Sequence, residues 1–211
     1  MNVSAYILTG KLGDLNNFLL QQCRALADAL SRTRLSGIHS SDLRRAKMTA
    51  TIIREGQPDT KITLTTSSLL REQNLGAGEG RKICAKEQDL SLAAHYARGK
   101  FPLIHSRTEK FPGGESLEDV AKRADKVIDE VLLPYAWQEF EGGAPMTVAI
   151  VSHGLFIAEL VARLLKRGNI NLDATGAGNL RGLKNTAFTK VQVTFKVCYH
   201  FLCPLTTMTK F

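Results

Sequence analysis

Residues 146–165, "MTVAIVSHGLFIAELVARLL", are the clearest indication of the fold class because their hydrophobic pattern changes once along their length. Residues 146–152 form an almost continuous apolar run, which is typical of a parallel strand buried on both faces. From residue 155 onward the pattern favours a helix, and His153 and Gly154 lie between the two. Open α/β sheets bind their ligands at such junctions, beyond the carboxyl ends of strands. A histidine there is equally compatible with a ring that is satisfied by loop carbonyls.

Strand and helix patterns alternate on both sides of this stretch. Ser116 and Asp119 have the spacing of a capped helix start, and the apolar stripe that follows is expected to end before Pro134. The predicted helices span residues 18–32, 40–55, 85–99 and 116–133, and the predicted strands span residues 35–39, 61–65 and 188–197. This alternation predicts an α/β fold, a three-layer sandwich with a mostly parallel sheet and helices on both faces.

The composition is that of a globular protein. With 211 residues, 44% of them hydrophobic, the chain can bury one sizeable core. We expect a single domain over residues 1–211, with an atypical amino terminus at residues 1–20 and an atypical tail at residues 198–211. No uncharged apolar run reaches about eighteen residues and no secretory leader is evident, which predicts no membrane association. The 4 cysteines show no disulfide or CxxC spacing, so the cytoplasm is the expected compartment.

The formal net charge of +8 raises the question of nucleic-acid binding. Lysine and arginine are spread along the chain, however, and no basic block contains interleaved aromatic residues. We therefore expect no nucleic-acid partner and attribute the charge to anionic small substrates. The sequence does not indicate an oligomeric state.

Three further residues are candidates for chemistry at the same edge of the sheet. Arg44 and Arg45 follow a predicted strand and open a predicted helix, so one of them could reach a ligand there. A guanidinium binds phosphate through two parallel hydrogen bonds; the alternative is two solvated arginines. Glu72 precedes a glycine-rich loop, where a carboxylic acid could protonate a leaving oxygen. Its alternative is a surface pair with Arg71.

Four motifs, taken together and in this order, resemble the histidine phosphatase superfamily, which has the phosphoglycerate mutase-like fold. The motifs are "SSDLRRAKMTA" at 40–50, "LREQNLGAGEG" at 70–80, "FPGGESLEDVAKR" at 111–123 and "VAIVSHGLFIAELVARLL" at 148–165. The resemblance extends from about Gln21 to Val197. The wording of the motifs is closer to the cofactor-independent phosphatases than to the dedicated glycolytic mutases.

The resemblance implies phosphate-monoester hydrolysis through a phosphohistidine, with no metal or other cofactor. In that mechanism Arg45 would bind the phosphoryl oxygens, His153 would hydrogen-bond them and stabilise the developing charge, and Glu72 would protonate the leaving alcohol. The partner would be a phosphorylated small molecule or another phosphate ester.

The sequence departs from the family where the nucleophile should be. No Arg-His-Gly motif occurs, and the segment "YILTGKLGDLNN" places Lys11 and Leu12 where the family has arginine and the nucleophilic histidine. Leucine cannot form a phosphoenzyme, so little or no turnover is expected. Recruitment of His39 as a substitute nucleophile is a further hypothesis, set against an ordinary histidine at the end of a strand.

Two functional hypotheses follow. The chain is either an impaired phosphomonoesterase, including a splice or gene-model fragment of an active one, or a non-catalytic phosphate-binding or regulatory protein. Three residues of the tail could be imagined as metal ligands, but their irregular spacing favours an apolar tail without a metal. They are Cys198, His200 and Cys203.

Overall fold

The computed structural model describes residues 2–9, 17–59, 61–140, 144–168, 188–198 and 201–209. The chain divides into two compact units, the first comprising Met1–Glu72 and Arg123–Phe211 and the second Gln73–Lys122. The two units are described separately, and the single domain expected over residues 1–211 stays a prediction.

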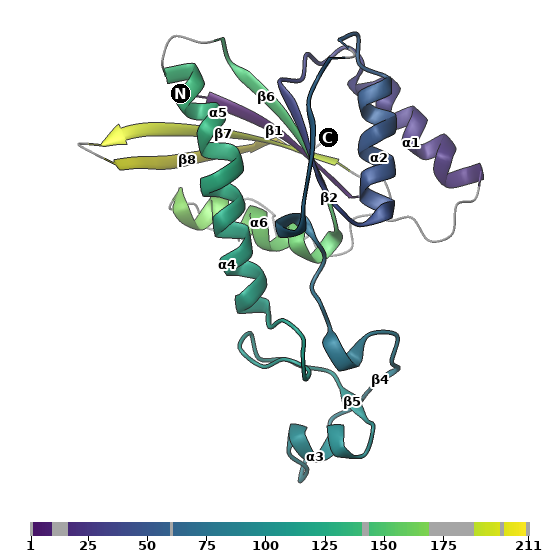
Figure 1. The fold of residues 1–211 in the computed structure, drawn as a ribbon. Helices are drawn as coiled ribbons and strands as arrows, with labels where there is room; N and C mark the ends of the chain where they lie inside the picture. Colours follow the sequence, from purple (N-terminus) through teal and green to yellow (C-terminus); the bar gives the residue numbers. More distant parts are fainter. Residues whose placement is uncertain are drawn as a thin grey trace. The chain divides into compact units, whose positions relative to one another are not determined.

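A six-stranded sheet forms the centre of the first unit (Figure 1). Its strand order is β3-β2-β6-β1-β7-β8. The strands are β1 (Asn2–Thr9), β2 (Gly37–Ser41), β3 (Leu64–Ser67), β6 (Met146–Ser152), β7 (Phe188–Cys198) and β8 (Phe201–Thr209). Within this sheet β3, β2, β6 and β1 pair in parallel, whereas β7 is antiparallel to both β1 and β8. The predicted α/β fold with a mostly parallel sheet is confirmed.

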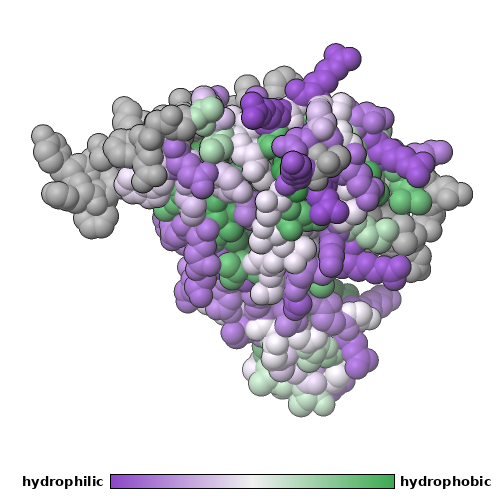
Figure 2. Space-filling view, turned by 45° about the horizontal axis from the view of Figure 1, so that its top comes forward, coloured by the Kyte–Doolittle hydropathy of each residue, from purple (hydrophilic) through white to green (hydrophobic). Residues whose placement is uncertain are grey.

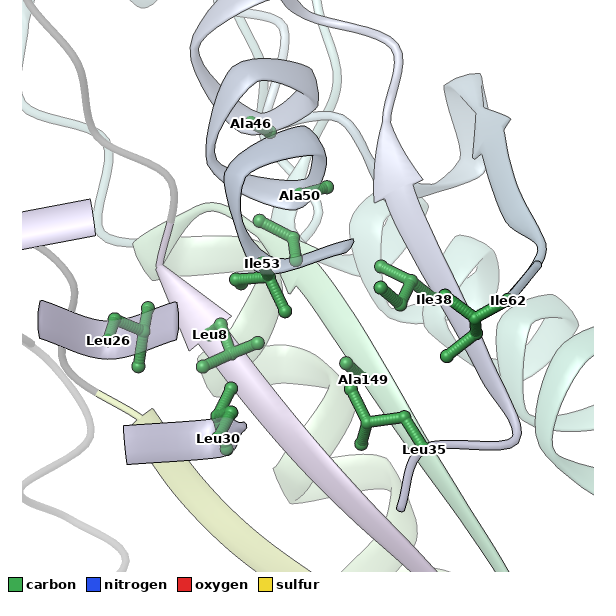
Figure 3. Close-up of a cluster of buried hydrophobic side chains, with 11 residues drawn as sticks. Leu8, Leu26, Leu30, Leu35, Ile38, Ala46, Ala50, Ile53, Ile62 and Ala149 are labelled. Atoms are coloured by element: carbon green, nitrogen blue, oxygen red, sulfur yellow. The ribbon is translucent and has the colours of Figure 1, made fainter. Parts of the chain in front are cut away.

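Helices cover both faces of this sheet, because successive side chains of its buried strands point to opposite sides. On one face, strand residues join helices α1 (Asn17–Leu30) and α2 (Arg44–Glu55) in one buried cluster (Figure 3). Its members are Leu8, Leu26, Leu30, Leu35, Ile38, Ala46, Ala50, Ile53, Ile62, Ala149 and Val151. On the other face, α5 (Leu133–Phe140) and α6 (Gly154–Arg167) pack against β1. Each fully buried aliphatic side chain in these layers contributes about 1.5–3 kcal/mol to folding.

The strand and helix predicted on either side of His153 are both present. The last five residues of β6 are buried, as expected for a strand covered on both faces. Helix α6 begins directly after His153, whose backbone is extended and occupies the N-cap position. The helix buries an apolar face and ends at Gly168. The junction therefore positions the histidine at the end of a strand and the start of a helix.

The helix predicted to end before Pro134 continues past it, so that prediction was wrong. Helix α4 (Leu117–Val127) passes into a π-helical turn (Ile128–Leu132), and α5 then begins at Leu133. In the π-helical turn the Leu133 N–H donates to the carbonyl of Ile128, five residues earlier. Pro134 therefore lies in the first turn of α5. A first turn tolerates proline because its N–H groups have no partner within the helix.

Two other segments differ from their predicted structure. Of the helix expected over residues 85–99, only α3 (Leu92–Ala97) forms, because the Ser91 hydroxyl accepts from the Ala94 N–H and caps the helix there. The tail, called atypical and assigned no strand or helix from the sequence, contributes β8, which pairs along β7. Pairing between strands is a tertiary interaction, which the tail's own pattern does not reveal.

The second unit is built around a small aromatic cluster and a short two-stranded sheet, β4 (Ile83–Cys84) and β5 (Phe101–Pro102). The rings of Tyr96, Phe101 and Phe111 are 5.6 to 5.9 Å apart between centroids. His95 is fully buried beside them. Its Nε2 accepts from the Glu87 N–H and its Nδ1 lies 2.9 Å from the Ser91 carbonyl oxygen, so this histidine is part of the unit's structure.

Hydrophilic side chains predominate on the face of the molecule seen in Figure 2, where hydrophobic residues form small, separated areas. The large exposed hydrophobic residues of the described chain are Ile83, Leu103 and Trp137. No helix in the described part of the chain has the length and apolar character needed to cross a membrane.

Candidate functional site

The carboxyl ends of three parallel strands meet at one edge of the sheet. Thr9 at the end of β1 is the register partner of Ser152 at the end of β6, and Ser40 of β2 is the partner of Val151. His153 follows directly from this edge. Arg45 lies in the first turn of α2, which follows β2, and His153 is the N-cap of α6, which follows β6, so both candidates lie after strands at this edge, as predicted.

His153 is buried, with 3% of its surface exposed, and both of its ring nitrogens have partners. Its Nδ1 accepts from the Arg45 Nε–H at 3.0 Å, and its Nε2 lies 2.9 Å from the Ser41 hydroxyl. A guanidinium can only donate, so Nδ1 carries no proton. The neutral ring therefore holds its proton on Nε2 and donates it to the Ser41 oxygen.

The surroundings of His153 keep its ring neutral. Burial is the main cause that lowers its pKa from 6.5 to about 4, and the charges of Arg45 and Arg123 lower it further. The carboxylate of Asp42 acts in the opposite direction but does not compensate. A neutral ring with a proton on Nε2 is a hydrogen-bond donor for an oxygen atom, and nearby guanidinium groups favour an anion at that position.

The structure separates the two arginine candidates. Arg45 is half-buried and bonds His153, and its two terminal amino groups have no hydrogen-bond partner among the described residues. Arg44 is exposed and instead lines a groove of about 450 Å³ on the outer face of α2, with Lys47, Met48 and others. Arg45 is thus the arginine at the sheet edge.

Glu72 reaches the same edge from the segment after β3. That strand passes into a 3-10 turn, Ser68–Leu70, and two residues later the Glu72 carboxylate meets the start of α6. Its oxygens accept from the N–H groups of Leu155 and Phe156 at 3.3 and 3.1 Å. A carboxylate is favourable at this position because the first amides of a helix lack partners within the helix and carry partial positive charge. The surface pair of Glu72 with Arg71 does not form, since Arg71 binds Asp42 instead.

The Asp42–Arg71 pair joins the loop before α2 to the segment that carries Glu72. The Nε and Nη2 of Arg71 donate to the carboxylate at 2.7 Å, and this bidentate contact lowers the pKa of Asp42 below its usual value. The pair is partly exposed, so solvent screens it and its contribution to stability is small. Its main effect is geometric, because it connects the neighbourhoods of Arg45 and Glu72.

Three residues of this edge were not among the candidates predicted from the sequence: Ser41, Ser152 and Arg123. Ser41 bonds His153, the Ser152 hydroxyl donates to the Leu70 carbonyl at 2.7 Å, and Arg123 of α4 binds the backbone next to Glu72. Arg123 had a signal in the sequence, because it is a charged residue three positions after Val120 and four before Val127, within a buried stripe. The two serines had no comparable signal.

His39 lies inside β2, in register with Ile150, three residues before His153. Its Nε2 is 2.8 Å from the Tyr135 hydroxyl of α5, and burial lowers the pKa of His39. Among the described residues no hydrogen bond joins it to Arg45, Glu72 or His153. Its recruitment as a nucleophile stays an untested hypothesis.

The positions aligned with the missing motif, Lys11 and Leu12, lie outside the described residues, as does His200. Cys198 and Cys203 lie in β7 and β8. Among the described residues no group of three or more His, Cys, Asp or Glu side chains is placed to hold a metal ion. The arrangement that remains is a donor set for an oxyanion, made of a guanidinium, a neutral imidazole and the start of a helix.

The family model of the histidine phosphatase superfamily (branch 1) matches residues 13–196. The chain belongs to this superfamily. The match covers the three motifs that carry Arg45, Glu72 and His153, and it agrees with the phosphoglycerate mutase-like fold expected from the sequence.

Curated relatives include phosphatases and mutases. The chain is 37% identical over 107 residues to fructose-2,6-bisphosphatase TIGAR of Xenopus laevis, covering 50% of this chain and 36% of that protein. It is 28% identical over 174 residues to the probable phosphoglycerate mutase GpmB of Yersinia pestis (strain Pestoides F), covering 82% and 70% of the two chains. The chain thus spans only about a third of the length of TIGAR.

Solved structures show the same fold with a bound anion. A complex of mycobacterial glucosyl-3-phosphoglycerate phosphatase with inorganic phosphate is 25% identical, with a TM-score of 0.63, and the match covers 98% of this chain and 95% of that one. Relatives in this superfamily therefore bind phosphate.

Proposed function

We propose that this chain binds the phosphate group of a phosphorylated small molecule at Arg45 and His153, and that its capacity to hydrolyse the ester is impaired. The contact between these two residues is the observation that carries the proposal. It leaves the terminal amino groups of Arg45 without a described partner and presents a proton on Nε2 of His153.

In this proposal, each residue has a distinct role. The Arg45 guanidinium binds two phosphoryl oxygens, and His153 Nε2 exchanges the Ser41 oxygen for a third. The hydrogen bonds of Glu72 to the start of α6 hold its carboxyl group close to His153. In its protonated form, this carboxyl group donates a proton to the leaving oxygen. None of these roles, which Arg45, His153 and Glu72 carry among the described residues, requires a metal or cofactor.

The absence of Arg-His-Gly from the sequence supports impairment. Loss of a covalent nucleophile in comparable enzymes lowers the rate by several orders of magnitude, whereas the remaining donors still bind the anion. The chain therefore acts as a phosphate-binding protein of a phosphatase lineage, or as a very slow phosphatase.

The names of the relatives suggest the substrate class. They refer to a fructose bisphosphate, a phosphoglycerate and a glucosyl phosphoglycerate, which are all small phosphorylated metabolites. We place such a substrate, rather than a nucleic acid, at this site. Cys23 and Cys84 are free thiols in the described chain, which supports a reducing compartment such as the cytoplasm.

Anion binding is tested by thermal unfolding with inorganic phosphate and with orthovanadate. At about 100 times Kd, a ligand stabilises by about 2.7 kcal/mol, which raises Tm by several degrees for a chain of this size. We expect this rise in the unmodified protein and its loss in His153→Ala. An unchanged Tm with both anions would overturn the proposal.

Catalysis is tested separately, by hydrolysis of p-nitrophenyl phosphate and by a search for an acid-labile phosphohistidine. We expect neither activity above the His153→Ala background nor phosphohistidine. Turnover that disappears in His39→Ala would identify a working substitute nucleophile and would refute the impairment.

A further inference from the structure

The segment that carries Glu72 pairs with no strand among the described residues, yet its carbonyl groups accept hydrogen bonds. The carbonyl of Leu70 accepts from the Ser152 hydroxyl, and those of Leu69, Arg71 and Glu72 accept from Arg123. Backbone carbonyls in a partly buried segment need such partners, because an unpaired polar group is costly away from water. The side chains of Ser152 and Arg123 therefore supply the hydrogen bonds that a neighbouring strand would otherwise make.

Arg123 provides three of these four bonds. Its Nη1 donates to the carbonyls of Leu69 and Arg71 at 2.8 and 2.7 Å, and its Nη2 donates to the carbonyl of Glu72 at 3.3 Å. The guanidinium also lies over the ring of Phe156, 4.9 Å from the centroid. A planar group with several fixed donors can do both at once, which a lysine ammonium cannot.

These contacts connect the segment that carries Glu72 to helix α6. The Phe156 N–H donates to the Glu72 carboxylate, while Arg123 binds both the backbone of Glu72 and the ring of Phe156. Arg123 thus contacts both Glu72 and Phe156, the two residues whose hydrogen bond orients the Glu72 carboxylate.

We infer that Arg123 is a positioning residue for the proposed phosphate site, holding Glu72 against the start of α6 beside His153. This inference rests on the proposed function. Arg123 acts through Glu72 and through its charge, and it need not touch the phosphate. Consistently, its charge is one of the causes that keep the pKa of His153 low, together with burial and Arg45.

The experiment compares Arg123→Gln and Arg123→Lys with Lys126→Gln. Lys126 is exposed one turn later on α4 and has no described contact. Its replacement makes the same change of charge without disturbing the contacts of Arg123 with Glu72 and Phe156. Two quantities are measured on each folded protein: the affinity for orthovanadate, and the pKa of His153 from NMR titration of its ring protons, assigned with His153→Asn.

For Arg123→Gln we expect a fall in vanadate affinity of about tenfold to a hundredfold, the scale on which displaced site groups act, and a raised pKa of His153. Arg123→Lys keeps the charge, so we expect the affinity to fall while the pKa of His153 stays close to that of the unmodified protein. Lys126→Gln is expected to change neither quantity.

The outcomes separate the two proposals. If the unmodified protein does not bind vanadate, the proposed function fails and the positioning role fails with it. If the unmodified protein binds but folded Arg123→Gln binds equally well, the positioning role alone is refuted. Equal losses in Arg123→Gln and Lys126→Gln would indicate a general charge effect and would also refute it.

Discussion

The Nε–H of Arg45 donates to Nδ1 of His153 at 3.0 Å, and this contact determines the state of the imidazole ring. Because the donor is a guanidinium, the ring is held neutral with its proton on Nε2, toward Ser41. A histidine in this state offers a hydrogen bond to an anion but cannot take a proton from the Ser41 hydroxyl through the same nitrogen. The geometry thus favours binding of an oxyanion over activation of Ser41.

Arg45→Lys should remove most of the binding of vanadate. A lysine offers no planar pair of donors to two oxygens, and a hydrogen bond to a charged group contributes about 1.5–3 kcal/mol, or roughly tenfold to a hundredfold in affinity. Arg44→Lys is the matched control, because Arg44 is the exposed neighbour that lines the outer groove. Vanadate titration checks both, and a larger loss in Arg44→Lys would place the anion on the wrong side of α2 for our proposal.

Stability should fall as the pH is lowered from about 6.5 to about 4. The pKa of His153 is about 4 in the folded protein and close to 6.5 when unfolded, so the unfolded chain binds the extra proton in this interval. The stabilisation is complete above 6.5 and is lost as the pH falls to 4, with a limit of about 3 kcal/mol.

Urea unfolding at several pH values measures this dependence. The slope between pH 4 and 6.5 should be shallower in His153→Asn than in the unmodified protein. Burial also lowers the pKa of His39, which acts in the same direction, so His39→Asn is measured in parallel. Asp119, whose pKa is held at about 2 by Lys110 and Ser116, affects stability only at more acidic pH. Identical slopes with and without His153 would contradict the neutral, buried ring.

Glu72→Ala should destabilise the protein by about 0.5–2 kcal/mol, the usual effect of removing a helix cap. The substitution leaves the N–H groups of Leu155 and Phe156 without their acceptor. Glu130→Ala, at an exposed position without a described contact, removes the same charge elsewhere. Urea unfolding should show a clear loss only for Glu72→Ala, and equal effects would mean that Glu72 does not cap α6.

Gly37→Ala should destabilise by about 1–3 kcal/mol, as overpacking does. A Cβ at Gly37 would lie 2.2 Å from the Tyr135 hydroxyl oxygen, which bonds His39. Tyr135→Phe should recover part of the loss in the double variant, because it removes the atom that clashes. Gly154→Ala is the control, since a Cβ there meets nothing within 4 Å. Thermal unfolding of the four proteins would disprove the explanation if the double variant were no more stable than Gly37→Ala.

Residue pattern was sufficient where the local signal matched the tertiary environment. The apolar run before His153 predicted β6, and the pattern of residues 18–32 predicted α1, in which Cys23, Leu26 and Leu30 are buried. The prediction that the helix ends before Pro134 was wrong because a π-helical turn precedes α5. The spacing of apolar residues does not show where such a turn changes the hydrogen-bond pattern. No strand was predicted in the tail, because β8 is defined by its pairing with β7.

Periodicity and residue identity are local properties, so residue order was enough to establish the fold class, the position of His153 between strand and helix, and the absence of an Arg-His-Gly motif. The folded chain was needed to show which arginine meets His153, which nitrogen carries the proton, and that Glu72 binds the start of α6. It also revealed Arg123 as the residue that holds the Glu72 segment. These are contacts between residues far apart in the chain, and they exist only once strand order and register bring the loops to one edge of the sheet.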